Sequence, residues 1–191
     1  MIKEKFVNAV AQGSNLSKED TVILRYGLKK IVLLIGDTIF TVAVGWLLGI
    51  PALSIVFQII FMLLRMHAGG YHSKTELKCT VHSAIVTVVS LIGIRMMVEW
   101  SWQNNLLFAF TGAVIMLLAP VEAENKPLSL KEKKINHRKT VGIVLAFFLA
   151  AAVSQVLGLD FFYAITAAFY AVCVLMVLGI AANKFFVGEN V

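Results

Sequence analysis

Long apolar runs, separated by short polar stretches, follow one another along almost the whole chain. A helix needs about 20 apolar residues to cross roughly 30 Å of hydrocarbon. The pattern therefore predicts an all-α, polytopic membrane protein with about six transmembrane helices. The expected spans are residues 31–48, 51–64, 81–98, 106–119, 141–157 and 161–182. The second and fourth are short, so each is expected either to cross while thinning the bilayer or to form a re-entrant segment.

The first 30 residues have a different pattern, because polar and apolar residues alternate there without a continuous apolar run. Ser17 is followed three residues later by Asp20, which is close to a capping box and indicates a helix start. We expect an interfacial amphipathic helix over residues 16–30. The predicted organisation is a cytosolic or interfacial segment, a membrane-embedded domain and a cytosolic tail, covering residues 1–30, 31–182 and 183–191.

Composition supports the membrane assignment and indicates which class of partner to expect. Hydrophobic residues make up 59% of the chain and charged residues 15%, whereas soluble domains carry about 25% charged residues. The net charge is +6, and the lysines and arginines gather mainly in residues 3–30 and 126–139, beside apolar spans. Such clusters are typical of anchoring on an anionic lipid leaflet. No basic stripe with interleaved aromatic residues is present, so the lipid bilayer is the expected partner and nucleic acid is not.

The positive residues also predict the orientation in the membrane. Lysine and arginine are frequent in residues 1–30, 65–80 and 120–140, and they are absent from residues 49–51, 99–105 and 158–160. Positive residues accumulate on the cytosolic side of membrane proteins. We therefore expect both termini, the 65–80 connection and a basic loop over 120–140 to face the cytosol.

The connection between the second and third spans holds the candidate chemistry. Three of the four histidines occur within it or just after it, together with Cys79. The pair Gly69-Gly70 is expected to end the second span and let the chain reverse. His72 and Cys79 are seven residues apart, which on one helix means about 10 Å along the axis. Proton transfer needs about 3 Å, so His72 is expected in a non-helical approach that folds back over the third helix.

Two residues can cap the start of that third helix. Ser73 with Glu76 forms a possible capping box, and Thr75 is the alternative cap. With Thr75 as the cap, Cys79 lies in the first turn, near the partial positive charge of the helix end. A nearby imidazole and a helix amino terminus both favour the nucleophilic thiolate.

The residues Arg65, Gly69, Gly70, His72 and Cys79 together resemble the signature of the accessory gene regulator B family. The chain length, the six-span hydropathy and the two basic segments are also similar. The resemblance implies a cysteine endopeptidase in the bacterial cell membrane, active on the cytosolic side without a cofactor and forming a homodimer. Cys79 is then the nucleophile and His72 its general base, while the arginine and both glycines support the site.

The same resemblance implies the substrate and the reaction. Family members trim a peptide precursor in Gram-positive quorum sensing, removing its carboxyl-terminal tail through a thioester and promoting cyclisation to a thiolactone or lactone. Such precursors resemble an amphipathic helix followed by an acidic tail. Basic residues of the 120–140 segment are then expected to hold that tail, with lipid phosphates as the alternative partner. The candidates are Lys131, Lys133, Lys134 and Arg138.

Other readings of these residues stay open at this stage. Asp37, inside the first span, either orients His72 or pairs with Arg65 or a lysine. The alternative role of Arg65 is to anchor the second span at the lipid interface. The alternative function is a non-enzymatic transporter or sensor that binds a peptide or metal through His67, His72, Cys79 and His82. Their spacing matches no familiar closed metal site, so no metal is expected.

Overall fold

The computed structural model describes residues 17–71, 75–97, 102–122 and 128–188. These residues form six helices joined by short connections. The chain divides into two compact units, Met1–Phe40 and Thr41–Val191, and each is described by itself.

Helix α2 (Lys18–Leu47) fills the described part of the first unit and ends in the second. Ser17 caps it, because the Asp20 amide donates to Ser17 Oγ at 3.1 Å and Ser17 Oγ donates to the Asp20 carboxylate at 2.7 Å. The start expected from the sequence is therefore confirmed. The helix does not break at Lys30, so the expected interfacial helix and the first expected span form one continuous helix. Lysine is a good helix former and no proline interrupts the segment, which explains the continuity.

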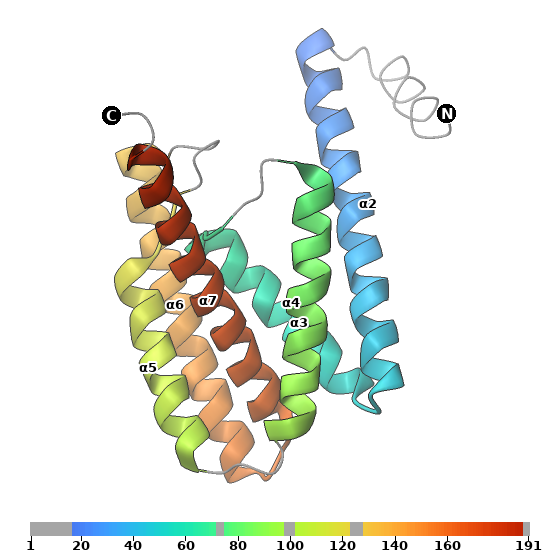
Figure 1. The fold of residues 1–191 in the computed structure, drawn as a ribbon, viewed down its shortest axis with the longest axis vertical. Coiled ribbons are helices and arrows are strands. Elements are labelled where there is room, and N and C mark those ends of the chain that lie inside the picture. The colour runs from blue at the N-terminus through green and yellow to red at the C-terminus, as the bar shows by residue number, and fades with distance from the viewer. Residues whose placement is uncertain (1–16, 72–74, 98–101, 123–127, 189–191) are drawn as a thin grey trace. The chain divides into compact units, whose positions relative to one another are not determined.

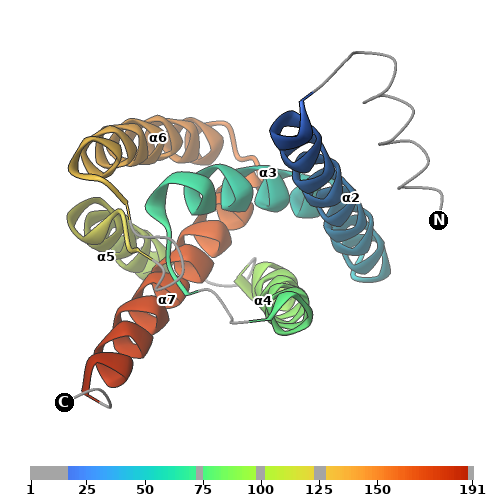
Figure 2. The same ribbon diagram turned by 90° about the horizontal axis from the view of Figure 1, so that it is seen from above.

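Five helices lie entirely in the second unit, and α7 is the central one. Helix α7 packs against the other four (Figure 1), with α4 on one side and α5 and α6 on the other (Figure 2). The five are α3 (Pro51–Ala68), α4 (Glu76–Met97), α5 (Trp102–Leu118), α6 (Leu130–Val156) and α7 (Phe161–Gly188). Of the described helices, all except α5 are long and apolar enough to cross a membrane, and α5 is a shorter apolar helix. The all-α polytopic fold is thus confirmed.

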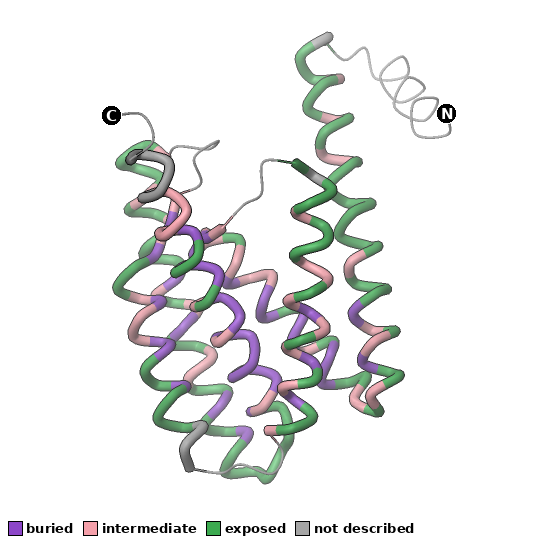
Figure 3. Tube along the Cα trace, in the orientation of Figure 1, coloured by how far each residue is buried: buried purple, intermediate pink, exposed green. Residues whose placement is uncertain are grey.

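The core of the second unit lies along α3 and α7, where buried residues are concentrated (Figure 3). Phe57 and Leu64 of α3 and Phe169 of α7 are completely buried. Phe169 also belongs to an aromatic cluster that joins α5, α6 and α7, with ring centroids 4.8–5.7 Å apart. Such aromatic contacts stabilise packing beyond the area that they bury.

The end of α2 is fixed on α3 by polar and small residues. Thr41 Oγ1 donates to Gln58 Oε1 at 3.1 Å, and both side chains are buried. Four residues further along α2, a Cβ at Gly45 would lie 2.2 Å from Ser54 Oγ, so the two backbones approach closely because this residue is glycine. Small residues and hydrogen bonds between helices are the usual means of packing helices in a membrane.

Helix α6 begins at Leu130, earlier than the expected span at Val141. Ser129 and Glu132 form a capping box, in which the Glu132 amide donates to Ser129 Oγ and the Ser129 amide to the Glu132 carboxylate. Most of the positive residues expected in a loop over 120–140 therefore lie on the first turns of a helix.

Candidate active site

Arg65 binds the backbone that directly follows α3. Helix α3 ends at Ala68, and Gly69 follows with φ of 73°, which confirms that the glycine pair ends this helix. The half-buried Arg65 donates from Nη1 to the Gly69 carbonyl and from Nη2 to the Tyr71 carbonyl. A planar guanidinium suits two acceptors at once. The arginine therefore organises the protein backbone, in addition to any contact with lipid.

The strap is the short non-helical segment of residues 69–71 that follows α3, and it is hydrogen-bonded on both sides through the backbone. On one side, the Val121 amide donates to the Ala68 carbonyl at 2.8 Å, and the Gly70 amide donates to the Val121 carbonyl at 3.2 Å. On the other side, the Tyr71 amide donates to the Leu175 carbonyl of α7 at 2.8 Å. The strap is thus fixed between the segment before α6 and the central helix.

The two glycines of the strap are required by close packing as well as by their backbone angles. A Cβ at Gly69 would lie 2.0 Å from the Val121 carbonyl oxygen. Gly70 has φ of 118°, and a Cβ there would lie 2.6 Å from Arg65 Nη1 and 2.9 Å from the Leu175 carbonyl oxygen. Such φ values are costly for any other residue. Substitution at either position must therefore displace the strap or its neighbours.

Cys79 lies in the first turn of α4. The Cys79 amide donates to the Thr75 carbonyl at 3.0 Å, and the Lys78 amide donates to Thr75 Oγ1 at 3.4 Å. Thr75 therefore caps α4, and it is one of the two caps expected from the sequence. The Cys79 side chain is partly exposed. Cys79 therefore lies within the turn over which the partial positive charge of a helix start extends.

The strap and the first turns of α4 meet around Cys79. Arg65 interacts electrostatically with Cys79, so a thiolate there would be attracted by the guanidinium. The rings of Tyr71 and His82 lie 5.6 Å apart between centroids. His82 is itself held by its own helix, because its Nδ1 is 2.6 Å from the Lys78 carbonyl oxygen. The nucleophile candidate is therefore within electrostatic range of a cation that is held by the backbone.

Two residues predicted for the site are not placed beside Cys79 by the structure. His72 lies outside the described residues, and its role as general base stays a prediction. Asp37 belongs to the first unit, so its role in orienting His72 also stays a prediction.

The remaining histidines of the described chain make contacts away from Cys79. His67 Nδ1 lies 3.3 Å from Asn136 Oδ1, which joins α3 to α6. His137 Nδ1 lies 2.9 Å from the Ala119 carbonyl oxygen, which joins the start of α6 to the end of α5. Across the described ranges, no group of three or more His, Cys, Asp or Glu side chains is arranged to hold a metal ion.

Glu122 follows Val121 in the chain and links the start of α6 to α7. Its carboxylate pairs with Lys133 Nζ at 2.8 Å and accepts a hydrogen bond from the Leu128 amide at 2.8 Å. These two interactions, the lysine first, hold the pKa of Glu122 below its ordinary value. Its carbonyl accepts from Asn183 Nδ2 of α7 at 2.9 Å. Lys133 is thus engaged within the protein, whereas the other three predicted tail-binding residues, Lys131, Lys134 and Arg138, are exposed.

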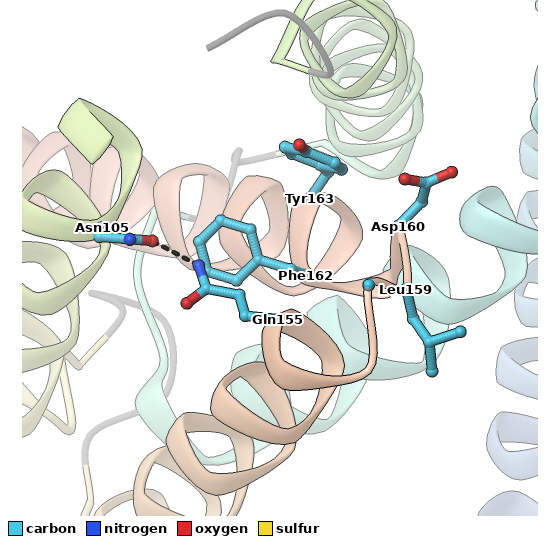
Figure 4. Close-up of a pocket in the computed structure, with 7 residues that line it drawn as sticks. Asn105, Gln155, Leu159, Asp160, Phe162 and Tyr163 are labelled. Carbon is cyan, nitrogen blue, oxygen red and sulfur yellow. Dashed lines mark hydrogen bonds between the residues drawn. The ribbon is translucent and has the colours of Figure 1, made fainter. Parts of the chain in front are cut away.

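A cavity of about 350 Å³ lies where α6 ends and α7 begins (Figure 4). The Gln155 side-chain amide donates to Asn105 Oδ1 across one side of it. Since the strap contacts the carboxyl-terminal part of α7, this cavity lies at the other end of that helix. It is lined by Asn105, Gln155, Gly158, Leu159, Asp160, Phe162 and Tyr163. The predicted site residues in the described ranges are not among these lining residues.

Comparison with known families gives a match along nearly the whole chain. The family described as accessory gene regulator B matches residues 3–182. The chain belongs to this family. An accessory gene regulator protein B from Staphylococcus intermedius is 27% identical over 152 residues, covering 78% of this chain and 80% of the relative. The chain is thus similar to accessory gene regulator B proteins over most of its length.

Two further relatives give the same result. A putative AgrB-like protein from Clostridium perfringens is 25% identical over 78% of this chain and 71% of its own length. An accessory gene regulator protein B from Staphylococcus aureus is 23% identical over 76% of each chain. No solved structure matches the chain.

Three residues of this family member that fix the strap were missed by sequence reasoning. Val121 and Leu175 act through their backbone groups, which no side-chain pattern indicates. Gly179, in α7, borders the strap from the other side. A glycine inside an apolar helix is unfavourable unless packing requires it, and this was the only signal available.

Proposed function

We propose that this chain is a membrane-embedded cysteine endopeptidase of the accessory gene regulator B family that processes a quorum-sensing peptide precursor. The observation that carries the proposal is the position of Cys79, in the first turn of α4 and within electrostatic range of Arg65. A helix amino terminus and a nearby cation are the surroundings that make a cysteine nucleophilic. Family membership supplies the peptide precursor as the substrate class.

The reaction proceeds through an acyl-enzyme. The Cys79 thiolate attacks a peptide carbonyl, a thioester forms, and the carboxyl-terminal tail leaves as an amine that takes its proton from His72. A cysteine thiol inside the bound substrate then gives its proton to His72, which restores the protonated imidazole, and the sulfur attacks the thioester. A thiolactone leaves, and the Cys79 thiolate is regenerated. A substrate serine gives a lactone by the same route.

The acidic tail of the precursor is held by charge. Val121 bonds to the strap, and its neighbour Glu122 pairs with Lys133 of α6, so the exposed cations of α6 lie at the strap end of the second unit. Lys133 contributes less, because Glu122 already neutralises it. The proposed tail-binding residues are therefore the exposed Lys131, Lys134 and Arg138.

The active site faces the cytosol, with both termini on the same side, and the protein acts as a homodimer. The distribution of positive residues supports this orientation. Labelling of single introduced cysteines with a membrane-impermeant reagent, in intact and in opened cells, tests the orientation. Light scattering of the detergent-solubilised protein tests the dimer.

The catalytic assignment is tested by expressing the chain together with its precursor peptide and following tail release by mass spectrometry. Cys79→Ala is expected to abolish release. Cys173→Ala is the matched control, because Cys173 is the other cysteine and lies in α7 against the core. Full release by Cys79→Ala would show that the proposed function is wrong.

His72 requires its own test, because a base and a structural residue differ in what their removal changes. His72→Gln is expected to abolish release while leaving the thermal unfolding temperature in detergent unchanged. His67→Gln serves as its control, since His67 contacts Asn136 of α6. Equal loss of release in the two variants would contradict a specific role for His72.

A further inference from the structure

The central helix has a glycine at the place where the strap crosses it. A Cβ added to Gly179 would lie 2.7 Å from the Tyr71 nitrogen, 2.8 Å from the Gly70 carbonyl carbon and 3.2 Å from the Gly70 Cα. All three are backbone atoms, so no flexible side chain can move aside. One turn earlier in α7, the Leu175 carbonyl accepts the hydrogen bond of the Tyr71 amide. The Gly70–Tyr71 peptide therefore fits against α7 only because residue 179 has no side chain.

The same peptide is linked to Arg65. The guanidinium donates to the Tyr71 carbonyl, and a Cβ at Gly70 would lie 2.6 Å from Arg65 Nη1. Arg65 in turn interacts electrostatically with Cys79. A continuous series of contacts thus runs from Gly179 through the strap to the guanidinium, and the guanidinium lies within electrostatic range of the sulfur.

We propose that Gly179 is a positioning residue for the reaction, because it lets the strap lie against α7 and so fixes Arg65 beside Cys79. A side chain at position 179 would push the Gly70–Tyr71 peptide away from α7, carrying the carbonyl acceptors of Arg65 with it. The guanidinium would then stabilise a Cys79 thiolate less. This inference rests on the proposed function of Cys79 and adds a residue of another helix to the site.

The first test compares Gly179→Ala with Gly142→Ala. Gly142 lies on the exposed side of α6, where an added Cβ would meet no described atom within 4 Å. Alanine favours a helix more than glycine does, so Gly142→Ala is expected to raise the unfolding temperature and leave tail release unchanged. Gly179→Ala is expected to lower kcat roughly 10- to 100-fold, the range for a small misplacement near the chemistry, while KM stays within about twofold.

A second readout follows Cys79 directly and requires no peptidase activity. In a Cys173→Ala background, the rate at which a small alkylating reagent modifies Cys79 is measured at one fixed pH. Gly179→Ala is expected to slow this modification, because the displaced guanidinium lies further from the sulfur. Lys78 and His82 share α4 with Cys79 and are unchanged in both proteins, so the difference reports on the strap side. Equal rates would overturn the proposal.

A double-mutant cycle separates positioning from general loosening of the fold. If Gly179 acts through Arg65, the alanine substitution should have little further effect on kcat or on alkylation when Arg65→Lys is already present. Additive losses would mean that Gly179 acts independently of Arg65, and the proposal would be wrong.

A final measurement uses the unsubstituted chain, so it stands even if Gly179→Ala fails to fold. Hydrogen exchange is expected to show a protected Tyr71 amide, because that amide is bonded to Leu175. Rapid exchange there would overturn the proposal. If exchange and alkylation behave as expected but Cys79→Ala still releases the tail, the positioning stands and the peptidase assignment fails.

Discussion

The two ends of the second unit use glycine for different purposes. At the end where α3 and α7 begin, Gly49 and Gly158 have φ of 74° and 65°, and an added Cβ would meet no described atom within 4 Å. At the strap end, Gly69 and Gly70 also have positive φ, but an added Cβ would strike neighbouring backbone or Arg65. Glycine serves only to turn the chain at the first end. At the second end, glycine also lets the strap pack closely against Val121, Arg65 and Leu175.

The largest expected effect separates these two kinds of glycine. Gly69→Ala is expected to destabilise the protein by more than the ~1–3 kcal/mol of a strained backbone position, because its Cβ would also overlap the Val121 carbonyl. Tail release should be lost. Gly158→Ala carries only the backbone cost of about 1–2 kcal/mol and should retain release. Thermal unfolding in detergent and mass spectrometry measure both, and equal effects would contradict the comparison.

Arg65→Lys is expected to have the next largest effect. Lysine offers a point charge where arginine binds two carbonyls through one planar group. Loss of one such hydrogen bond from a charged donor costs about 1.5–3 kcal/mol of stability, and the resulting misplacement of the guanidinium is expected to lower kcat roughly 10- to 100-fold. Arg95→Lys, at an exposed position in the last turn of α4, is the control and should retain kcat. Unchanged kcat in Arg65→Lys would show that the strap needs only a positive charge.

Glu122 predicts a pH dependence at the strap end. Its folded pKa is lowered, first by Lys133 and then by the Leu128 amide. A carboxyl group whose pKa is lowered by folding stabilises the folded state at pH values above the ordinary pKa of a glutamate. This contribution is lost as the pH falls through the pKa of the folded state. Glu122→Gln should therefore be less stable than the parent chain at pH 7, and the difference should shrink as the pH falls below 4.5. Unfolding temperatures across that range test this, and a constant difference would contradict it.

The smallest effect is expected at the far end of the unit. Gln155→Ala removes the amide pair with Asn105 beside the cavity. Both side chains are exposed, so the loss should be at most about 1 kcal/mol. Tail release should be unchanged, because this end takes no part in holding Arg65. A large fall in release would show that the two ends are coupled through α7.

The sequence was sufficient for features that depend on local patterns. Apolar runs located the helices, and the Gly69-Gly70 pair correctly located the end of α3. Thr75 was one of the two expected caps. Each of these features depends on residues within a few positions of one another. These features are therefore determined by local backbone angles and side-chain hydrogen bonds, which the residue types at neighbouring positions indicate.

Two helix boundaries that were expected from the sequence were wrong. The start of α6 was expected at Val141, since the basic residues before it were assigned to a loop. Ser129 and Glu132 nevertheless form a capping box that is visible in the sequence. The break expected after Lys30 does not occur, because a change from polar to apolar residues does not by itself end a helix.

The partners of the strap could not have been predicted. Val121 and Leu175 contribute backbone carbonyl groups, and these are chemically the same in every residue. Their importance depends on which segments the fold brings together. The contact of His67 with Asn136 is of the same kind, since it joins residues of two helices that are distant in the sequence.

The location of Leu175 and Gly179 in α7 has a consequence for biosynthesis. The ribosome makes α3, the strap and α4 well before it makes α7, and chains fold from the amino terminus as they emerge. Until α7 has entered the bilayer, the Tyr71 amide lacks its acceptor and the guanidinium beside Cys79 is not held in place. Under the proposed function, a nascent chain would therefore carry Cys79 in an incomplete site, and peptidase activity would arise only after translation has supplied α7.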